Sequence, residues 1–440
     1  MGKPDSITGI AAQHGHEAMH RLRTRISDLV AARAERMARQ RRRIHATPEP
    51  AGAEHGTTEF IAEQLRECGL QPRLMPGNTG LVVDIDLGAE RDTFVAIRAE
   101  LDCVRVNDDK QVPYASTRPG LCHACGHDMH STIALNAGQV LHELRSEISN
   151  LGSEISDLKS ASHVPALKPL HNIRLIFQPA EETATGARQM IQHGAINHVE
   201  CMLAMHVEPF MPVGVVGLRR GALTVACKLF SFALRGRGGH SARPFEAIDP
   251  ILAATSLVDQ LYQYCPRVVD ARHPTVLTIG SIHAGSAPNA IPDEATITGT
   301  LRTLREEDLR LIQTRMDEIR EAVAQASGCD IELTFGSYCP ATNNDTRLLD
   351  LVESVARDTL GHESVQWIDL PSMGGEDFAF YQELIPGAII RLGAAMADER
   401  KRRPLHSSLF DVDENALSVG TRLMAQWALE AAMQFEDAKG

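Results

Sequence analysis

The order of strand and helix patterns changes once along the chain, and this change limits the folds that are open to it. Residues 1–222 alternate helical and strand patterns, which is typical of an α/β domain built on a mostly parallel sheet. Between residues 223 and 335 the order becomes strand, helix, strand, strand, helix, strand, as in a ferredoxin-like βαββαβ sandwich. One sheet cannot hold both orders, so we expect 223–335 to be an inserted domain and 336–440 to return to the first domain.

Hydrophobic periodicity indicates the individual elements. In the first domain we expect strands at "GLVVDIDL", "TFVAIRA", "NIRLIF", "CMLAMHV" and "AIIRLG", with helices at 57–68, 346–360 and 413–435 and one directly after residue 127. In the insert we expect strands at 223–235, 275–283, 294–302 and 329–336, with helices at 247–264 and 306–326. The Ser-, Lys-, Asp- and Glu-rich stretch 146–170 predicts an exposed insertion between a helix and a strand. The basic run 39–43 predicts a solvated helix face whose arginines pair with nearby acids.

The run "HACGHDMH" at residues 123–130 crowds histidine, cysteine and acidic side chains into a polar stretch before a helical pattern. Cys125 and His127 lie two residues apart, so a thiolate and an imidazole can converge on one cation. A buried structural thiol is the ordinary alternative for Cys125. We interpret the pair as half of a metal site.

The other half of the site is expected far away in sequence, because an α/β active site is assembled at the carboxyl ends of several strands. The apolar run 173–177 breaks at a proline and delivers Glu181 and Glu182 into the following loop. The strand pattern "CMLAMHV" ends on His206, and His406 stands in the loop "RRPLHSSLFDVDE". These residues are the candidates for the second half.

Each candidate, taken singly, has an ordinary explanation. A histidine on an apolar strand is commonly a satisfied core residue, and a Glu pair in a loop is commonly just solvated. Their joint order is different: strand, histidine-rich loop, strand, Glu pair, strand, histidine is the layout that a two-metal hydrolase needs. The sequence therefore predicts a dinuclear metal site.

Composition narrows the class of protein. The formal charge of −13 argues against a general nucleic-acid or acidic-membrane surface. No apolar stretch approaches the length that spans a bilayer, and the polar start "MGKPDSITG" carries no secretory apolar region. Nine cysteines without regular spacing indicate reduced thiols. We therefore expect a cytoplasmic enzyme of ordinary globular composition.

Ordered motifs extend over almost the whole chain. They are "RRRIHATPEP" (41–50), "IRAELD" (97–102), "HACGHDMH", "FQPAEE" (177–182), "LAMHVEP" (203–209), "GRGGHSARP" (236–244), "APNAIPD" (287–293), "GTLRT" (299–303) and "MGGEDFAFY" (373–381). In this order they resemble the M20 metallopeptidase family, in its amidohydrolase branch of N-acyl amino acid, hippurate and auxin-conjugate hydrolases. Only the first forty or so residues and 146–170 fall outside the resemblance.

The resemblance implies a set of metal ligands and a base. The implied ligands of two divalent ions are Cys125, His127, Glu182, His206 and His406. The implied general base is Glu181, which would take a proton from a water and pass it to the leaving amine. Two ions that share a water lower its pKa toward about 7, and this donor set would accept Zn, Mn, Co or Ni.

Asp102 ends the strand pattern "VAIRAELD", where its carboxylate can orient a ligand imidazole through the free N–H. An ordinary strand-end aspartate is the alternative. This chain departs from the usual Arg-Ala-Asp-Met-Asp-Ala-Leu of the branch by carrying Glu100, Cys103 and Val104. Glu100 is longer than the aspartate expected at its position, and this difference bears on the shape of the substrate pocket more than on catalysis. Two serines after His406 replace the expected proline-bearing turn.

The resemblance also implies that the inserted domain is a lid and that it forms a homodimer. His240 would donate to the tetrahedral oxyanion, reaching across the dimer, whereas a strand-ending turn is the ordinary explanation of its glycine-rich surroundings. Asn289 and Arg302 would contact the substrate near its carbonyl and carboxylate. Arginine suits a free α-carboxylate because its planar fork bonds both oxygens. Alone, Arg302 would be a solvated strand residue.

These observations predict a metal-dependent amidohydrolase that cleaves small N-acyl or N-aroyl amino acids to a carboxylate and a free amino acid. A dipeptidase or carboxypeptidase with the same site is the nearest alternative. A non-catalytic metal-binding protein is another, although a structural site has no use for Glu181 beside the metal. A third is a cysteine-nucleophile hydrolase built on Cys125, which a chelator would leave active.

Overall fold

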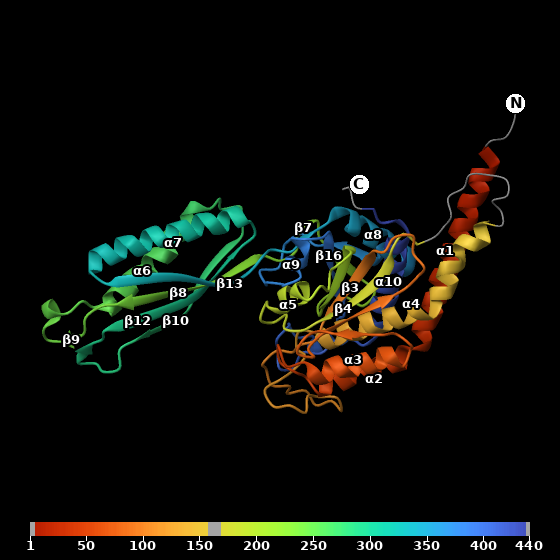
Figure 1. Cartoon of the computed structure of the whole chain (residues 1–440). Helices are drawn as coiled ribbons and strands as arrows, with labels where there is room; N and C mark the ends of the chain where they lie inside the picture. Colours follow the sequence, from red (N-terminus) through yellow and green to blue (C-terminus); the bar gives the residue numbers. More distant parts are fainter. Residues whose placement is uncertain (1–4, 157–168, 437–440) are drawn as a thin grey trace. The chain divides into compact units, whose positions relative to one another are not determined.

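The computed structural model describes residues 5–156 and 169–436, and these form two compact units. Unit 1 comprises Met1–Gly221, Asn344–Asp369 and Phe380–Gly440, within the described ranges. Unit 2 comprises Ala222–Asn343 and Leu370–Ala379 (Figure 1). The inclusion of the second segment in unit 2 had no counterpart in the sequence pattern. Within the described ranges, no helix has the length and apolar character needed to cross a membrane.

Unit 1 is an α/β fold, as expected, but its sheet is mixed. Its described residues form an eight-stranded sheet in the order β1 (Arg73–Leu74), β2 (Leu81–Ile85), β4 (Asn172–Gln178), β3 (Phe94–Glu100), β5 (Val199–Glu208), β16 (Gly387–Gly393), β6 (Val216–Leu218), β15 (Val365–Trp367). The central strands β4, β3, β5 and β16 are parallel, whereas β2 and β6 are antiparallel to their inner neighbours. The prediction of a mostly parallel sheet therefore holds for the central strands and for β15 beside β6, whereas the pairings β1–β2, β2–β4 and β16–β6 are antiparallel.

Short connections explain the antiparallel strands. Eight residues separate β2 from β3, and seven separate β5 from β6. A parallel return needs a crossover of a dozen or more residues, usually helical, so these connections leave strands of opposite direction in the sheet. Alternating hydrophobicity identifies the strands but carries no information on their direction.

Long helices pack against the sheet and against one another. Unit 1 contains α1 (Asp5–Ala32), α2 (Ala34–Ala46), α3 (His55–Arg66), α4 (His127–Ser156), α5 (Gly186–Gln192), α8 (Thr346–Leu360), α9 (Ala379–Gln382, which begins on the last residue of unit 2) and α10 (Asn415–Gln434). Helices α4 and α10 contact each other and β3, and the fully buried Trp427 of α10 belongs to the same core as Leu135 of α4 and Ile97 of β3. The helix after residue 127 runs on to Ser156, so the expected insertion at 146–170 continues this helix up to that point. Residues 157–168 lie outside the described ranges.

Unit 2 has the strand and helix order expected from the sequence. Its elements are β8 (Ala226–Arg235), β9 (Gly239–His240), α6 (Pro250–Tyr264), β10 (Thr275–Ala284), β11 (Ala290–Ile291), β12 (Glu294–Thr303), α7 (Glu306–Ser327) and β13 (Asp330–Cys339). The short strands β7 (Gly221–Ala222) and β14 (Asn343–Asn344) lie where the chain enters and leaves the unit. The main sheet is antiparallel in the order β10-β12-β8-β13, which is the ferredoxin-like arrangement. Phe232, Leu257 and Ile312 belong to its own hydrophobic core.

Candidate metal and catalytic site

Cys125 and His206 meet because the turn before α4 passes close to the end of β5. Gly126 has φ 87°, and a Cβ at this position would lie 2.3 Å from Cγ2 of Val207. Only glycine combines this backbone conformation with such a close approach. The result places Cys125 Sγ 3.5 Å from His206 Nε2. Since Nδ1 of His206 lies 2.8 Å from the Val207 carbonyl oxygen and donates to it, the Nε2 lone pair faces the thiol.

His127, the first residue of α4, is oriented by the end of β3. Its Nδ1 lies 2.9 Å from the Asp102 carbonyl oxygen and 3.2 Å from Asp102 Oδ1. Its Nε2 is buried and has no hydrogen-bond partner among the described residues. A buried imidazole nitrogen with a lone pair and no partner is the arrangement that a metal ion satisfies.

The loop after β4 brings two carboxylates to the same place. The backbone N–H of Glu182 donates to Asp102 Oδ2 at 3.0 Å, so Asp102 contacts both the imidazole and the carboxylate segment. His127 Nε2 lies 3.8 Å from Glu181 Oε2 and 4.0 Å from Glu182 Oε1. The buried Oε1 of Glu182 accepts no hydrogen bond from the described residues, and it lies 3.5 Å from His406 Nε2.

His406 reaches the cluster through an unusual backbone conformation. It has φ 65°, which is uncommon for a residue with a side chain, and its N–H donates to the Ala124 carbonyl oxygen at 2.8 Å. The hydrogen bond ties the C-terminal loop to the turn that carries Cys125. Such local strain is found mainly at functional sites, where the surrounding contacts enforce it.

The five candidate ligands and Glu181 therefore converge. Three overlapping groups have ligand atoms within 4.8 Å of one another, namely Cys125–His127–His206, Cys125–Glu182–His406 and His127–Glu181–Glu182. Thiol, imidazole and carboxylate donors fit divalent transition metals. Together with the unpartnered Nε2 of His127 and Oε1 of Glu182, this donor set fits a dinuclear metal site.

The electrostatics of the cluster suit cation binding. Burial lowers the pKa of His206 well below its ordinary value, so its imidazole is neutral and can ligate. Burial opposes ionisation of Glu182, but His406 and His127 outweigh it and lower the pKa of that carboxyl. Burial raises the pKa of the Cys125 thiol, so a thiolate here needs a cation beside it.

The candidate residues of unit 2 fall into two places. His240 on β9 pairs with Ala290 on β11, and Ser241 N–H donates to the Asn289 carbonyl oxygen, so His240 and Asn289 are neighbours. Arg302 lies near the far end of β12, eight residues from Glu294, which is about 26 Å along a strand. It donates to the Met373 carbonyl oxygen at 2.7 Å. The fold of unit 2 brings His240 to Asn289 but not to Arg302.

A buried charge network beside the site had no counterpart in the sequence analysis. Arg41 is fully buried, and its guanidinium lies 2.6 Å from Asp128 Oδ2 and 3.0 Å from Asp411 Oδ1. His45 Nδ1 lies 2.7 Å from Asp128 Oδ2. Burial opposes charging of His45, but the carboxylates of Asp128 and Asp108 outweigh it and raise its pKa to about 9. The network links α2 to the residue after His127 and to the loop that follows His406.

The prediction that residues 39–43 form a solvated face was thus wrong for one arginine and right for its neighbour. Arg41 is buried, whereas the side chain of Arg42 is 49% exposed and pairs with Glu414 at the surface. Helical periodicity in this run does not distinguish the two, because the run is polar throughout. Arg41 is buried because its acidic partners Asp128 and Asp411, which are 87 and 370 residues away in sequence, lie inside the fold.

Arg41→Met is expected to destabilise unit 1 by about 3–5 kcal/mol, because it leaves the buried Asp128 carboxylate without its main counter-charge. The measurement is the shift of the denaturant midpoint of unfolding. Arg42→Met is the matched control, and its surface pair predicts a change of no more than about 1 kcal/mol. Equal stability of the two variants would contradict the assigned role of Arg41.

The longer acid at position 100 has a specific partner. Glu100 Oε2 lies 2.8 Å from His130 Nδ1, and the Val207 N–H donates to His130 Nε2 at 2.9 Å. Glu100 also pairs with Arg98. Glu100 therefore orients a buried histidine that holds the end of β5 beside His206. No signal in the sequence distinguished His130 from the candidate ligands near it.

Comparison with known proteins gives consistent matches. A family model described as peptidase family M20/M25/M40 matches residues 96–155 and 158–430. An N-acetylcysteine deacetylase of Bacillus subtilis (strain 168) is 33% identical over 396 residues, which is 90% of this chain and 96% of that protein. IAA-amino acid hydrolase ILR1-like 2 of Arabidopsis thaliana is 32% identical over 400 residues, which is 90% of this chain and 84% of that protein.

A solved structure agrees with these matches. The Bacillus subtilis YXEP protein, described as a dinuclear metal binding peptidase from the M20 family, is similar to this chain with a TM-score of 0.75 at 29% sequence identity. The similarity covers 92% of this chain and all of that chain. Sequence and fold therefore match the same group of proteins over nearly the whole length.

Proposed function

The chain belongs to peptidase family M20/M25/M40 and is a metal-dependent amide hydrolase, and from this premise we propose that it cleaves N-acyl or N-aroyl amino acids to a carboxylate and a free amino acid. The observation that carries the proposal is the convergence of six side chains from four distant segments of unit 1. Both named relatives support the substrate class, because one is a deacetylase of N-acetylcysteine and the other a hydrolase of IAA-amino acids.

In the proposed site Cys125, His127, Glu182, His206 and His406 would hold a pair of divalent ions. Bound ions of this kind supply Lewis acidity at a carbonyl and lower the pKa of a water toward about 7. Asp102 fixes the tautomer of His127 by accepting from Nδ1–H. Zn, Mn, Co and Ni all suit the donor set.

Glu181 is the proposed general base. Its carboxylate lies 3.8 Å from the Nε2 of His127, close to the ligands without being needed as one of the five. It would take the proton from the attacking water and deliver it to the leaving amine nitrogen. The protonated amine then departs as a neutral molecule. Protonation is needed because the acyl carbon does not expel an amide anion.

Unit 2 is proposed to complete the site as a lid. His240 would donate to the oxyanion, Asn289 would contact the substrate near its carbonyl, and Arg302 would bind the α-carboxylate with two parallel hydrogen bonds. Arg302 lies about 26 Å along β12 from Glu294, the first residue of that strand. This distance is longer than an N-acyl amino acid. This separation supports a homodimer in which His240 and Asn289 act on the substrate of the partner subunit.

The proposed ligand Cys125 supports a cytoplasmic location. Its buried side chain forms no disulfide, and it is useful as a metal ligand only while it is reduced. An oxidising compartment would expose this thiol to disulfide exchange or oxidation.

A substrate panel tests the proposal directly. Metal-reconstituted protein is assayed with N-acetyl amino acids, N-benzoyl amino acids and unblocked dipeptides carrying the same C-terminal residue. We expect kcat/KM to be at least tenfold higher for the blocked substrates. Preference for a free α-amine would instead assign the site to a dipeptidase. If protein with two bound ions hydrolysed none of these amides, both the amidohydrolase and the dipeptidase assignments would be wrong.

A further inference from the structure

The segment 49–54 lies between α2 and α3, overlaps the motif "RRRIHATPEP" (41–50) only at its first two residues, and has no role in the proposed reaction. We propose that Glu54 is a positioning residue: its buried carboxylate holds the Ala180 turn in the left-handed conformation that presents Glu181 and Glu182 to the metal site. The consequence for catalysis rests on the proposed function. The structural part, a carboxylate that orders the 180–182 loop, does not.

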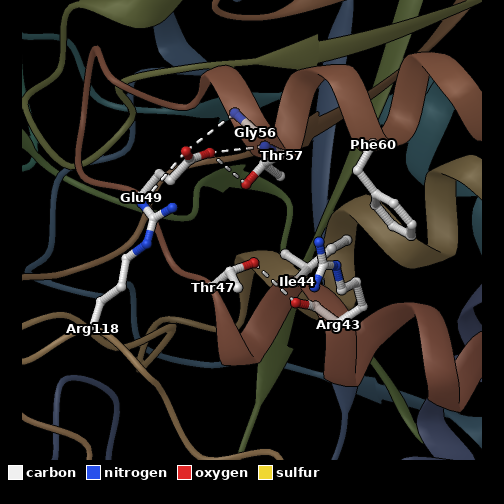
Figure 2. A pocket seen from close by; sticks show the side chains of 8 residues that line it. All are labelled: Arg43, Ile44, Thr47, Glu49, Gly56, Thr57, Phe60 and Arg118. Carbon is white, nitrogen blue, oxygen red and sulfur yellow. Dashed lines mark hydrogen bonds and ion pairs between the residues drawn. The ribbon is translucent and has the colours of Figure 1, made fainter.

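Glu49, and not the N-cap residue Glu54, caps the N-terminus of α3. Glu54 is the N-cap residue of α3, yet its side chain makes no capping hydrogen bond. Figure 2 shows the Glu49 carboxylate doing so instead: it accepts from the N–H groups of Gly56 at 3.1 Å and Thr57 at 2.8 Å, with Arg118 3.4 Å away. The helix N-terminus is therefore already satisfied, and Glu54 can point elsewhere.

The Glu54 carboxylate binds the backbone of the catalytic loop. The residue is fully buried, and its Oε1 accepts from the N–H groups of Gly52 and Ala180, both at 2.8 Å. Its Oε2 is also buried and has no partner within the described part of the chain. Burial raises the pKa of Glu54 to about 7. Burying a carboxylate is costly, so the position indicates a specific task for the group.

Ala180 is the residue that needs such a contact. Its φ of 55° is left-handed, which costs about 1–2 kcal/mol for a residue with a Cβ. Its carbonyl oxygen accepts from the N–H groups of Gly186 at 3.1 Å and Thr185 at 3.3 Å, so the turn is closed on its other side. Gly186 is required there, because a Cβ would lie 1.6 Å from the Pro179 carbonyl oxygen.

Two carboxylates therefore fix the loop on both sides of the proposed base. Glu54 binds the N–H of Ala180, and Asp102 binds the N–H of Glu182 at 3.0 Å. Glu181 lies between them. If Ala180 relaxed to a right-handed or extended conformation, the two glutamates would rotate away from Nε2 of His127, which now lies 3.8–4.0 Å from their carboxylate oxygens.

The test compares Glu54→Ala with Glu49→Ala, because both remove a buried carboxylate from the same segment but only Glu54 contacts Ala180. Hydrogen–deuterium exchange of the metal-free protein is followed at pH 8 by mass spectrometry, in peptides that cover 178–186 and 55–66. We expect Glu54→Ala to speed exchange at least tenfold in 178–186, and Glu49→Ala to do so in 55–66 only. Unchanged exchange in 178–186 of Glu54→Ala would overturn the proposal, whatever the enzyme hydrolyses.

Steady-state kinetics and a rescue variant complete the test. Glu54→Ala is expected to lower kcat by about 30-fold with KM within threefold, since the loss is in the placement of Glu181. In the Ala180→Gly background the same substitution should cost threefold or less, because glycine adopts the left-handed conformation without help. An undiminished loss in that background would refute action through the Ala180 turn. Glu54→Gln, which keeps one accepting oxygen, guards against misfolding and should retain at least a third of kcat.

Discussion

Glu181→Gln is expected to lower kcat by about 10³-fold while leaving two metal ions per chain in place. The amide cannot take a proton from water, and general acid–base groups contribute about 10²–10⁴ in rate. The carboxylate is not one of the five proposed ligands, so its neutralisation should not release the ions. The measurements are kcat with an N-acetyl amino acid and metal content by elemental analysis.

Glu182→Gln is the matched control for that experiment. It changes the neighbouring carboxylate by the same chemistry, but Glu182 Oε1 lies 3.5 Å from His406 Nε2 among the proposed ligands. We expect this variant to lose at least one ion per chain. Full activity in Glu181→Gln would refute the base assignment, and loss of metal from Glu181→Gln alone would exchange the two roles.

Removal of metal is expected to reduce activity below about 1% of its starting value. The proposed ligands would hold the ions, and bound divalent ions would supply the Lewis acidity that lowers the pKa of a water and polarises a carbonyl. Dialysis against a chelator followed by addition of Zn, Mn, Co or Ni should restore the rate. The measurement is activity against the number of ions bound per chain.

Alkylation distinguishes this mechanism from one that uses Cys125 as a nucleophile. Cys125 is only 7% exposed and lies 3.5 Å from His206, so in the metal-loaded enzyme it should react slowly with iodoacetamide. We expect alkylation to inactivate only the metal-free protein and to block its reconstitution. An enzyme that survived chelation and lost activity to alkylation would be a cysteine hydrolase.

Much of the site was predictable because ligand chemistry is a property of residue types. Cys125, His127, Glu181, Glu182 and His206 each stand at the end of a strand pattern or just before a helix, where α/β folds gather functional groups. His406 was identified by its motif alone. In the structure these six residues lie together, and their roles as ligands and base stay predictions that the experiments above address.

The direction of the strands and the extent of α4 were harder to predict from the sequence. The sheet of unit 1 is mixed, because the connections from β2 to β3 and from β5 to β6 are too short to cross over. The stretch 146–156 continues α4, since polar residues extend an established helix at little cost. Hydrophobic periodicity encodes neither the direction of a strand nor the residue at which a polar helix ends.

The sequence by itself determined the main strands and helices of the two units, their order, and the chemical groups at their ends, because side-chain pattern and ligand chemistry are local properties. Only the tertiary structure decided which groups become partners. Arg41 is buried and Arg42 is exposed, and Glu54 turns to Ala180, 126 residues away, because Glu49 already satisfies the helix beside it. Such pairings depend on long-range packing, in which a buried charge is tolerated only where another segment supplies its partner.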